Sequence, residues 1–118
     1  MRKYLDDIGV TERPDTWEDK PHFKEQREQF GFDERETYSL DYSFILWLYE
    51  RLKMYLDKSD KIIDLTFHKY TFRGKEYTQK EMIVMLITKL EYVFHSATYG
   101  ISDDILEIFT LIVHDLWW

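Results

Sequence analysis

The chain has 118 residues, a hydrophobic fraction of 44%, a formal net charge of −7 and no cysteine. These totals fit one domain with its own core, and they exclude a disulfide scaffold, a thiolate zinc site and a cysteine nucleophile. The longest apolar run, residues 44–49, is far shorter than the roughly 20 residues of a membrane span, and residues 1–10 lack the apolar segment of a signal peptide. We therefore expect a soluble, intracellular protein with no membrane partner.

Residues 1–37 are predicted to form an N-terminal arm that packs on the core. This segment is polar, holds both prolines and carries well-separated aromatic residues. A short helix is expected from Pro21 to Gln29, ended by Gly31. Because side chains such as Trp17 and Phe23 are costly to leave in water, we expect the arm to cover the core.

Residues 38–118 are predicted to form a single helical domain whose first helix spans about 41–57. Ser39 or Asp41 begins this helix, which then carries apolar residues on nearly every side. A helix of this kind is either buried or covered by a partner. Its main apolar stripe is Ile45, Leu48, Leu52 and Tyr55, widened by Phe44, Trp47 and Met54.

A β-hairpin is predicted at about 64–78, because the hydrophobic period changes there. Ile63, Leu65 and Phe67 alternate with polar residues, and the segment is rich in β-branched and aromatic types. Arg73 and Gly74 offer the turn, so we expect strands at about 64–72 and 75–78.

Two further helices are predicted at about 79–96 and 103–117. Thr78 and Glu81 have the spacing of a capping box, and Ser102 is placed to cap the last helix. We expect Trp117 to dock into the core as that helix closes. The predicted fold is therefore α+β and mainly helical, a three-helix core with a small hairpin between the first two helices and the N-terminal arm.

The charges are segregated along the chain. Residues 51–80 hold eight Lys or Arg against four acids, whereas the chain after Lys89 holds five acids and no Lys or Arg. This pattern predicts an acidic surface that could complement a basic groove of a partner. Its residues are Asp103, Asp104, Glu107 and Glu91, and Trp47 and Trp118 are the candidate aromatic contacts.

A metal site is the alternative interpretation of the same acids. If the last two helices are antiparallel neighbours, Glu91, His95, Asp104 and Glu107 could gather around Mg²⁺, as in all-helical metal-dependent nucleotide hydrolases. However, Asp104 and Glu107 are already accounted for as first-turn partners of the helix dipole. No phosphate-binding or nucleophile motif occurs, so we predict no catalytic residue and no cofactor.

Nucleic acid is not an expected partner. The hairpin region mixes Lys69, Arg73 and Lys75 with aromatic residues, a combination that can grip single strands. The net charge of −7 instead favours an ordinary amphipathic hairpin with its lysines in solvent.

Two blocks within residues 31–90 carry a resemblance. GFDERETYSLDYSFILWLYERLKMY and IIDLTFHKYTFRGKEYTQKEMI are similar to uncharacterised small acidic proteins of bacteriophages and prophages of Gram-positive bacteria, with Tyr38 where that family has Trp. The resemblance brings no activity with it. It implies a phage accessory protein in the host bacterial cytoplasm, and by analogy a non-enzymatic protein that binds and inhibits or redirects a host or bacterial defence protein, as anti-CRISPR proteins do. A role in phage morphogenesis or assembly is the other alternative.

Self-association is the last expectation from the sequence. The first helix has more apolar faces than one neighbour can cover, and Trp117 and Trp118 add apolar surface. These features favour a homodimer. The competing interpretation is that the arm, through Trp17 and Phe23, covers the excess within one chain.

Overall fold

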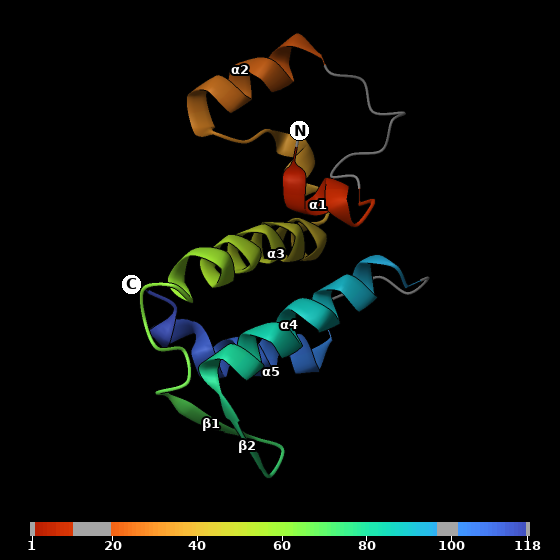
Figure 1. Ribbon diagram of the computed structural model, residues 1–118. Helices are drawn as coiled ribbons and strands as arrows, with labels where there is room; N and C mark the ends of the chain where they lie inside the picture. Colours follow the sequence, from red (N-terminus) through yellow and green to blue (C-terminus); the bar gives the residue numbers. More distant parts are fainter. Residues whose placement is uncertain (1, 11–19, 97–101, 118) are drawn as a thin grey trace.

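The computed structural model describes residues 2–10, 20–96 and 102–117 and shows a mainly helical α+β fold, as predicted (Figure 1). None of the described helices is long and apolar enough to cross a bilayer. In chain order the elements are α1 (Lys3–Asp7), α2 (Pro21–Phe30), the 3₁₀ helix η1 (Glu34–Thr37), α3 (Leu40–Ser59), β1 (Lys69–Phe72), β2 (Lys75–Thr78), α4 (Gln79–Phe94), α5 (Asp103–Ile112) and the 3₁₀ helix η2 (Val113–Asp115).

The predicted place of the hairpin, between the first two helices, is wrong. Two helices, α1 and α2, precede α3, so the hairpin follows the third helix of the chain. The five-residue α1 is too short to show a helical period in the sequence. The second, α2, was expected within the arm, and Gly31 ends it with a φ of 86°.

The core lies between α3, α4 and α5. Figure 1 shows α4 beside both other helices, and it packs against each of them. Met82, Ile83, Leu86 and Leu90 of α4 are fully buried. The hydroxyl of Tyr49, on α3, donates to Glu91 Oε1 of α4 at 2.9 Å, which fixes the two helices to each other.

The N-terminal segment adds to this core from the other side of α3. Leu5 and Val10 are buried within the same apolar cluster as α3, and α1 contacts α3 directly. In contrast, α2 stands apart from α3 in Figure 1, and η1 lies between them in the chain. The N-terminal elements therefore form a layer of their own over α3.

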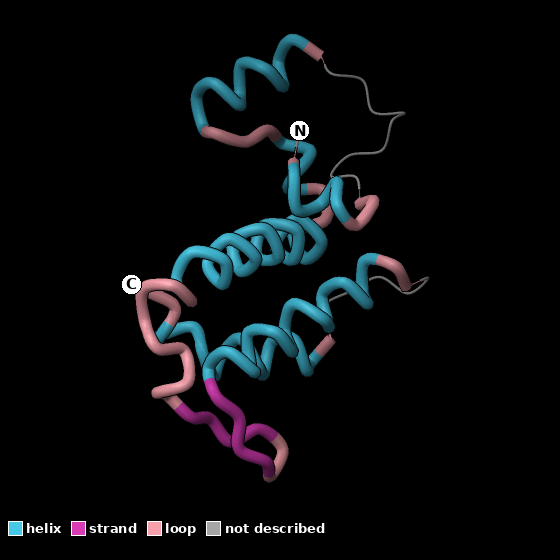
Figure 2. The backbone as a smooth tube through the Cα atoms, in the orientation of Figure 1, coloured by secondary structure: helices cyan, strands magenta, loops and turns pink. Residues whose placement is uncertain are grey.

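The hairpin projects from one end of the helices (Figure 2). Its strands are antiparallel, with Phe72 opposite Lys75. Arg73 and Gly74 have φ values of 51° and 79°, which a two-residue type I′ turn requires, so the predicted turn is confirmed.

The predicted start of the first strand at residue 64 is wrong, because β1 begins at Lys69. Asp64 Oδ1 accepts hydrogen bonds from the Thr66 amide at 2.9 Å and from the Thr66 hydroxyl. This local turn replaces strand pairing in that segment.

The C-terminal segment differs from the expectation of one helix over 103–117. The α-helix ends at Ile112 and η2 follows. The Asp115 carbonyl accepts from Gln79 Nε2 at 3.0 Å, and its carboxylate accepts from the Tyr70 hydroxyl. Burial, and then Asp115 itself, raise the pKa of Tyr70, so this phenol stays a donor.

Trp117 does not dock into the core. Its side chain is 73% exposed, whereas Leu116 packs against the apolar cluster. The bonds to Asp115, together with a 3.1 Å bond from the Tyr55 hydroxyl to the Trp117 carbonyl, hold the backbone in a position that turns Leu116 inward instead.

Both predicted helix caps are present, and one of them can be tested directly. Thr78 Oγ1 accepts from the Glu81 amide at 3.2 Å, and Glu81 Oε1 accepts from the Thr78 amide at 2.9 Å. Ser102 caps α5 in the simpler way, by accepting from the Ile105 amide.

We expect Thr78→Ala to lower the free energy of unfolding by about 1 kcal/mol, because one amide of α4 loses its acceptor. Urea unfolding measures this loss, and Thr78→Ser should keep most of the stability. Equal stability of all three proteins would contradict the role of the cap.

Candidate functional site

The candidate site is a groove of about 1100 Å³ between α3 and the N-terminal layer. Its floor and one wall come from α3, including Tyr42, Leu46 and Trp47. The opposite wall comes from the start of α1, the end of α2 and the segment that contains η1. The site therefore exists because the N-terminal elements rest on α3 as a separate layer.

The wall from α3 presents an unusual apolar face. Leu40, Trp47 and Met54 are seven residues apart, so they lie along one face of the helix over about 21 Å. Their exposed fractions are 67%, 49% and 53%. Trp47 and Met54 line the groove, and Leu40 continues the same face. The helix predicted to be apolar all round thus buries one side and leaves this stripe open.

Trp47 is held in place although it is half exposed. Its ring stacks on Phe44, with ring centroids 6.4 Å apart, and Phe44 packs edge-on against Phe109 of α5 at 5.8 Å. The Arg51 guanidinium carbon lies 4.8 Å from the centre of a Trp47 ring. An aromatic side chain that is fixed in this way can bind a partner with little loss of conformational entropy.

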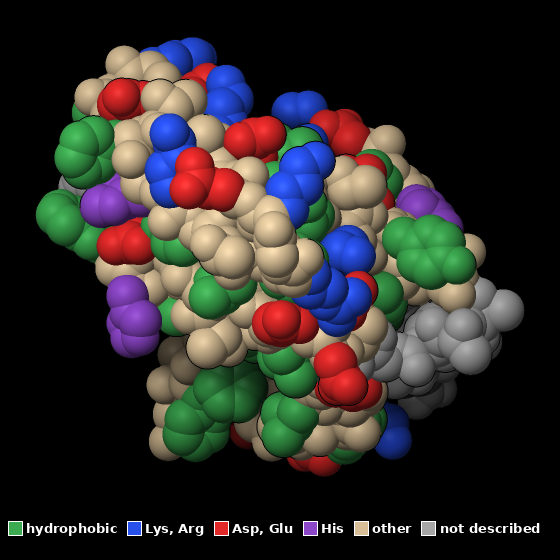
Figure 3. Space-filling view, turned by 90° about the horizontal axis from the view of Figure 1, so that it is seen from below, with side chains coloured by type: hydrophobic (Ala, Val, Ile, Leu, Met, Phe, Trp, Pro, Cys, Tyr) green, Lys and Arg blue, Asp and Glu red, His purple; other side chains and the backbone are tan. Residues whose placement is uncertain are grey.

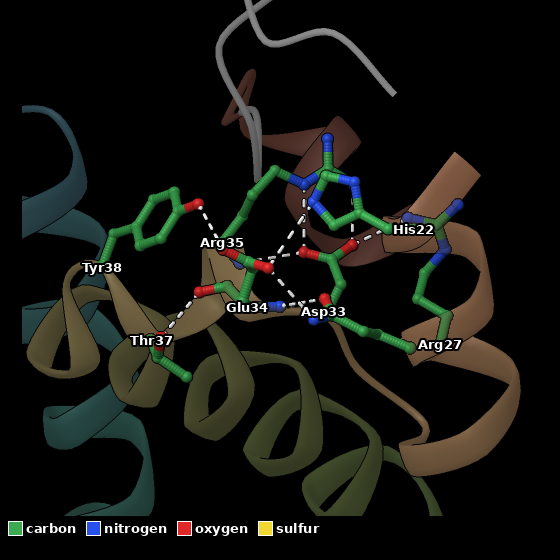
Figure 4. A network of polar contacts seen from close by, with 8 residues as sticks. His22, Arg27, Asp33, Glu34, Arg35, Thr37 and Tyr38 are labelled. Atoms are coloured by element: carbon green, nitrogen blue, oxygen red, sulfur yellow. Dashed lines mark hydrogen bonds and ion pairs between the residues drawn. The ribbon is translucent and has the colours of Figure 1, made fainter. Parts of the chain in front are cut away.

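The opposite wall is built on Asp33, whose side chain is 3% exposed (Figure 4). Arg35 Nε donates to Asp33 Oδ1 at 3.0 Å, and Arg35 Nη2 and Arg27 Nη1 each donate to Oδ2 at 2.7 Å. The hydrogen bond from the Arg35 side chain, with further bonds from Arg27 and the Arg35 amide, holds the pKa of Asp33 well below its usual range. Asp33 is therefore a fixed anion that joins α2 to η1.

Further contacts strengthen this joint. The Glu34 amide donates to Gln26 Oε1 at 2.9 Å, and Gln26 Nε2 donates to Glu34 Oε1 at 3.1 Å. The Arg35 guanidinium also covers the buried ring of Phe23 at 4.3 Å. These polar contacts with the η1 segment hold α2 in place, so this wall of the groove depends on them. This network was missed in the sequence, although Asp33 and Glu36 have the spacing of a capping box, which the structure shows.

The groove differs in charge from the rest of the chain. Its described lining holds five cationic side chains and three carboxylates, an excess of two positive charges in a chain of net charge −7. Each of these cations is ion-paired within the chain: Arg2 and Arg51 with Glu50, Lys3 with Asp7, and Arg27 and Arg35 with Asp33. The cations are Arg2, Lys3, Arg27, Arg35 and Arg51, and the carboxylates are Asp33, Glu36 and Glu50.

The predicted acidic surface is largely paired within the chain. Asp104 contacts both Lys89, at 3.2 Å, and Arg73, and Glu107 contacts Arg73 at 3.3 Å. These bonds, first of all that from Lys89, lower the pKa of Asp104. Asp103 is exposed at the start of α5. Figure 3, which views the end with the hairpin, shows acidic and basic side chains interspersed instead of a patch of one sign.

The structure brings together only part of the predicted metal set. Asp104 and Glu107 share Arg73, whereas Glu91 accepts the Tyr49 hydroxyl bond and His95 is an exposed residue at the end of α4. Within residues 2–10, 20–96 and 102–117, no three His, Asp or Glu side chains lie close enough to hold a metal ion. Of the predicted aromatic contacts, Trp47 lies in the groove and Trp118 falls outside the described residues.

Comparisons with protein-family models, with curated proteins and with solved structures found no match.

Proposed function

We propose that this chain is a non-enzymatic binding protein that recognises another protein through the groove over α3. The observation that carries the proposal is Trp47, which is half exposed yet fixed between Phe44 and Arg51. Tryptophan and arginine are the residues that most often dominate protein–protein binding energy. Trp47 therefore has the properties of an anchor in an interface.

The biological setting comes from the resemblance of residues 31–90 to small phage and prophage proteins. This resemblance supports the proposal of a phage accessory protein that acts in the host bacterial cytoplasm and inhibits or redirects a host or defence protein.

The groove is suited to binding rather than to proton transfer. Asp33, its buried acid, is held as an anion by two arginines, so it serves the structure of the wall.

The acidic half of the predicted surface contributes less to this proposal than the aromatic half. Asp104 and Glu107 already contact Arg73, so their charge is partly satisfied before any partner arrives. Asp103 is the member of that group whose charge the structure leaves exposed. Substitutions of Trp47 and of Asp103 can therefore show which of the two surfaces binds the partner.

Affinity capture from a lysate of a Gram-positive bacterium tests the proposal. We expect a protein that is retained by the unmodified chain and lost with Trp47→Ala, since loss of an anchoring tryptophan weakens binding by about thirtyfold or more. Trp117→Ala is the matched control, because Trp117 is 73% exposed outside the groove lining. Circular dichroism should show unchanged folding in both variants.

The outcomes distinguish the two surfaces. A partner that is lost with Asp103→Lys and retained with Trp47→Ala would move the interface to the acidic surface. Capture of the same proteins by every variant would contradict the proposed function.

A further inference from the structure

We infer that three side chains, Arg2, Glu50 and Arg51, form a strap that closes the middle of the apolar stripe on α3 and opens when a partner binds there. This inference rests on the proposed binding function and adds a restraint to it. It follows from the two ion pairs that meet at Glu50 and from the position of Glu50 between Trp47 and Met54 in the chain.

The strap begins as a bridge across the groove. Arg2 stands just before α1, on the N-terminal wall, and its Nε donates to Glu50 Oε2 at 2.8 Å while its Nη2 donates to Oε1. A guanidinium that holds both oxygens of one carboxylate makes a stronger and more directional contact than a single bond. The side chains of Glu50 and Arg2 are 14% and 39% exposed. The pair is therefore partly shielded from screening by salt.

The bridge continues over the stripe itself. Because an α-helix turns by about 100° and rises by about 1.5 Å per residue, Glu50 and Arg51 lie on opposite flanks of the stripe, between Trp47 and Met54 along the axis. Arg51 Nη1 lies 3.7 Å from Glu50 Oε1, and the Arg51 guanidinium carbon lies 4.8 Å from the centre of a Trp47 ring. The three charged groups therefore cross the stripe from one flank to the other and cover part of Trp47.

The strength of the strap suits a contact that opens on binding. Ion pairs between partly exposed groups change an equilibrium constant by a factor of only about two to five. A strap of this strength keeps most chains closed and yields to a partner that buries Trp47 and Met54. The apparent affinity for that partner is then reduced by the fraction of chains that are open. Phe44, which stacks on Trp47 without contacting the strap, holds the ring when the strap opens.

A purely structural role, in which the ion pair serves to hold α1 on α3, is the competing explanation. However, α1 has an apolar attachment of its own. Leu5 is fully buried, and Val10 lies in the same apolar cluster. Removal of the strap should consequently open the stripe without releasing α1, and this difference separates the two explanations.

Hydroxyl-radical labelling read by mass spectrometry tests the strap in the full chain without a partner. Glu50→Gln removes the acceptor of both arginines, and Arg2→Ala removes the bridge from the N-terminal wall and serves as a second variant if Glu50→Gln fails to fold. We expect labelling of Trp47 and Met54 to rise by up to about twofold in both variants, since each side chain is already half exposed in the closed form. Lys58→Ala is the matched control, because it removes a cation of α3 outside the groove lining.

Two further measurements connect the strap to binding and exclude the structural role. In affinity capture from the same bacterial lysate, Glu50→Gln and Arg2→Ala should retain about two- to fivefold more partner than the unmodified chain. Arg2→Lys keeps the charge but not the contact with both oxygens, so it should lie in between. Circular dichroism and hydrogen exchange of the α1 amides should match the unmodified chain in every variant.

Unchanged labelling of Trp47 and Met54 in both variants would overturn the inference. So would increased labelling with loss of protection in α1, because the ion pair would then be a structural support. Increased labelling with equal or reduced capture would also overturn it, and the proposed function would still stand if capture depends on Trp47. If capture does not depend on Trp47, the proposed function is wrong and the strap has no binding to restrain.

Discussion

Replacing Asp33 with alanine should release α2 and dismantle one wall of the groove. The change removes the acceptor of Arg35, whose side chain is 3% exposed, and of Arg27. Breaking a buried ion pair by deleting one partner costs about 3–5 kcal/mol, because the remaining charge stays buried without compensation. We expect hydrogen exchange of the α2 amides to rise towards that of an unstructured segment.

Matched controls separate this effect from general destabilisation. Glu28→Ala alters an exposed acid on α2 and should leave exchange unchanged. The core of α4 should keep its protection in Asp33→Ala, because α2 is joined to η1 and stands apart from α3. Undiminished protection of α2 in Asp33→Ala would refute the role of the network.

The same network predicts how stability depends on pH. The pKa of Asp33 is lowered in the folded chain, so its contribution is fully present above the unfolded value of about 3.9 and is lost as the pH falls below it. Protection of α2 in the unmodified chain should therefore decline with the pH below about 4. Asp33→Asn should remove this part of the dependence, because the amide does not titrate.

The features that could be predicted from the sequence are those set by a few neighbouring residues. Thr78 and Glu81 are three positions apart, and Gly31 ends α2 through its own backbone freedom. The turn at Arg73 and Gly74 is equally local. In each case the chemistry that decides the structure lies within one turn of the chain, so the residue pattern was sufficient.

The groove depends on contacts between residues that are distant in sequence. The sequence predicts that Trp47 widens the apolar stripe of its helix and also offers it as a contact with a partner. Burial on α3 depends on where α1 and α4 dock, and these elements leave Trp47 half exposed. Likewise, Asp104 and Glu107 pair with Arg73, which lies 31 and 34 positions away. Helical period gives the faces of a helix, and only the packing decides which face is covered.

Replacing Leu90 with alanine should produce the largest loss of stability in the core itself. Its side chain is fully buried in the second half of α4, the helix that contacts both α3 and α5. Truncation of such a leucine costs about 2–5 kcal/mol, because apolar area is lost and the close-packed neighbours fill the cavity only in part. Leu48→Ala, on the facing side of α3 and 2% exposed, should lose a similar amount.

Urea unfolding followed by circular dichroism measures both losses, and an unchanged slope with denaturant would show that the same structure unfolds. Leu106→Ala is the control, because the side chain on α5 is 45% exposed and should cost less than about 0.5 kcal/mol. A loss for Leu90→Ala as small as that of the control would mean that α4 does not occupy the centre of the fold. The open stripe on α3 would then lose its structural basis, since it exists because the core on the other side of that helix is already filled.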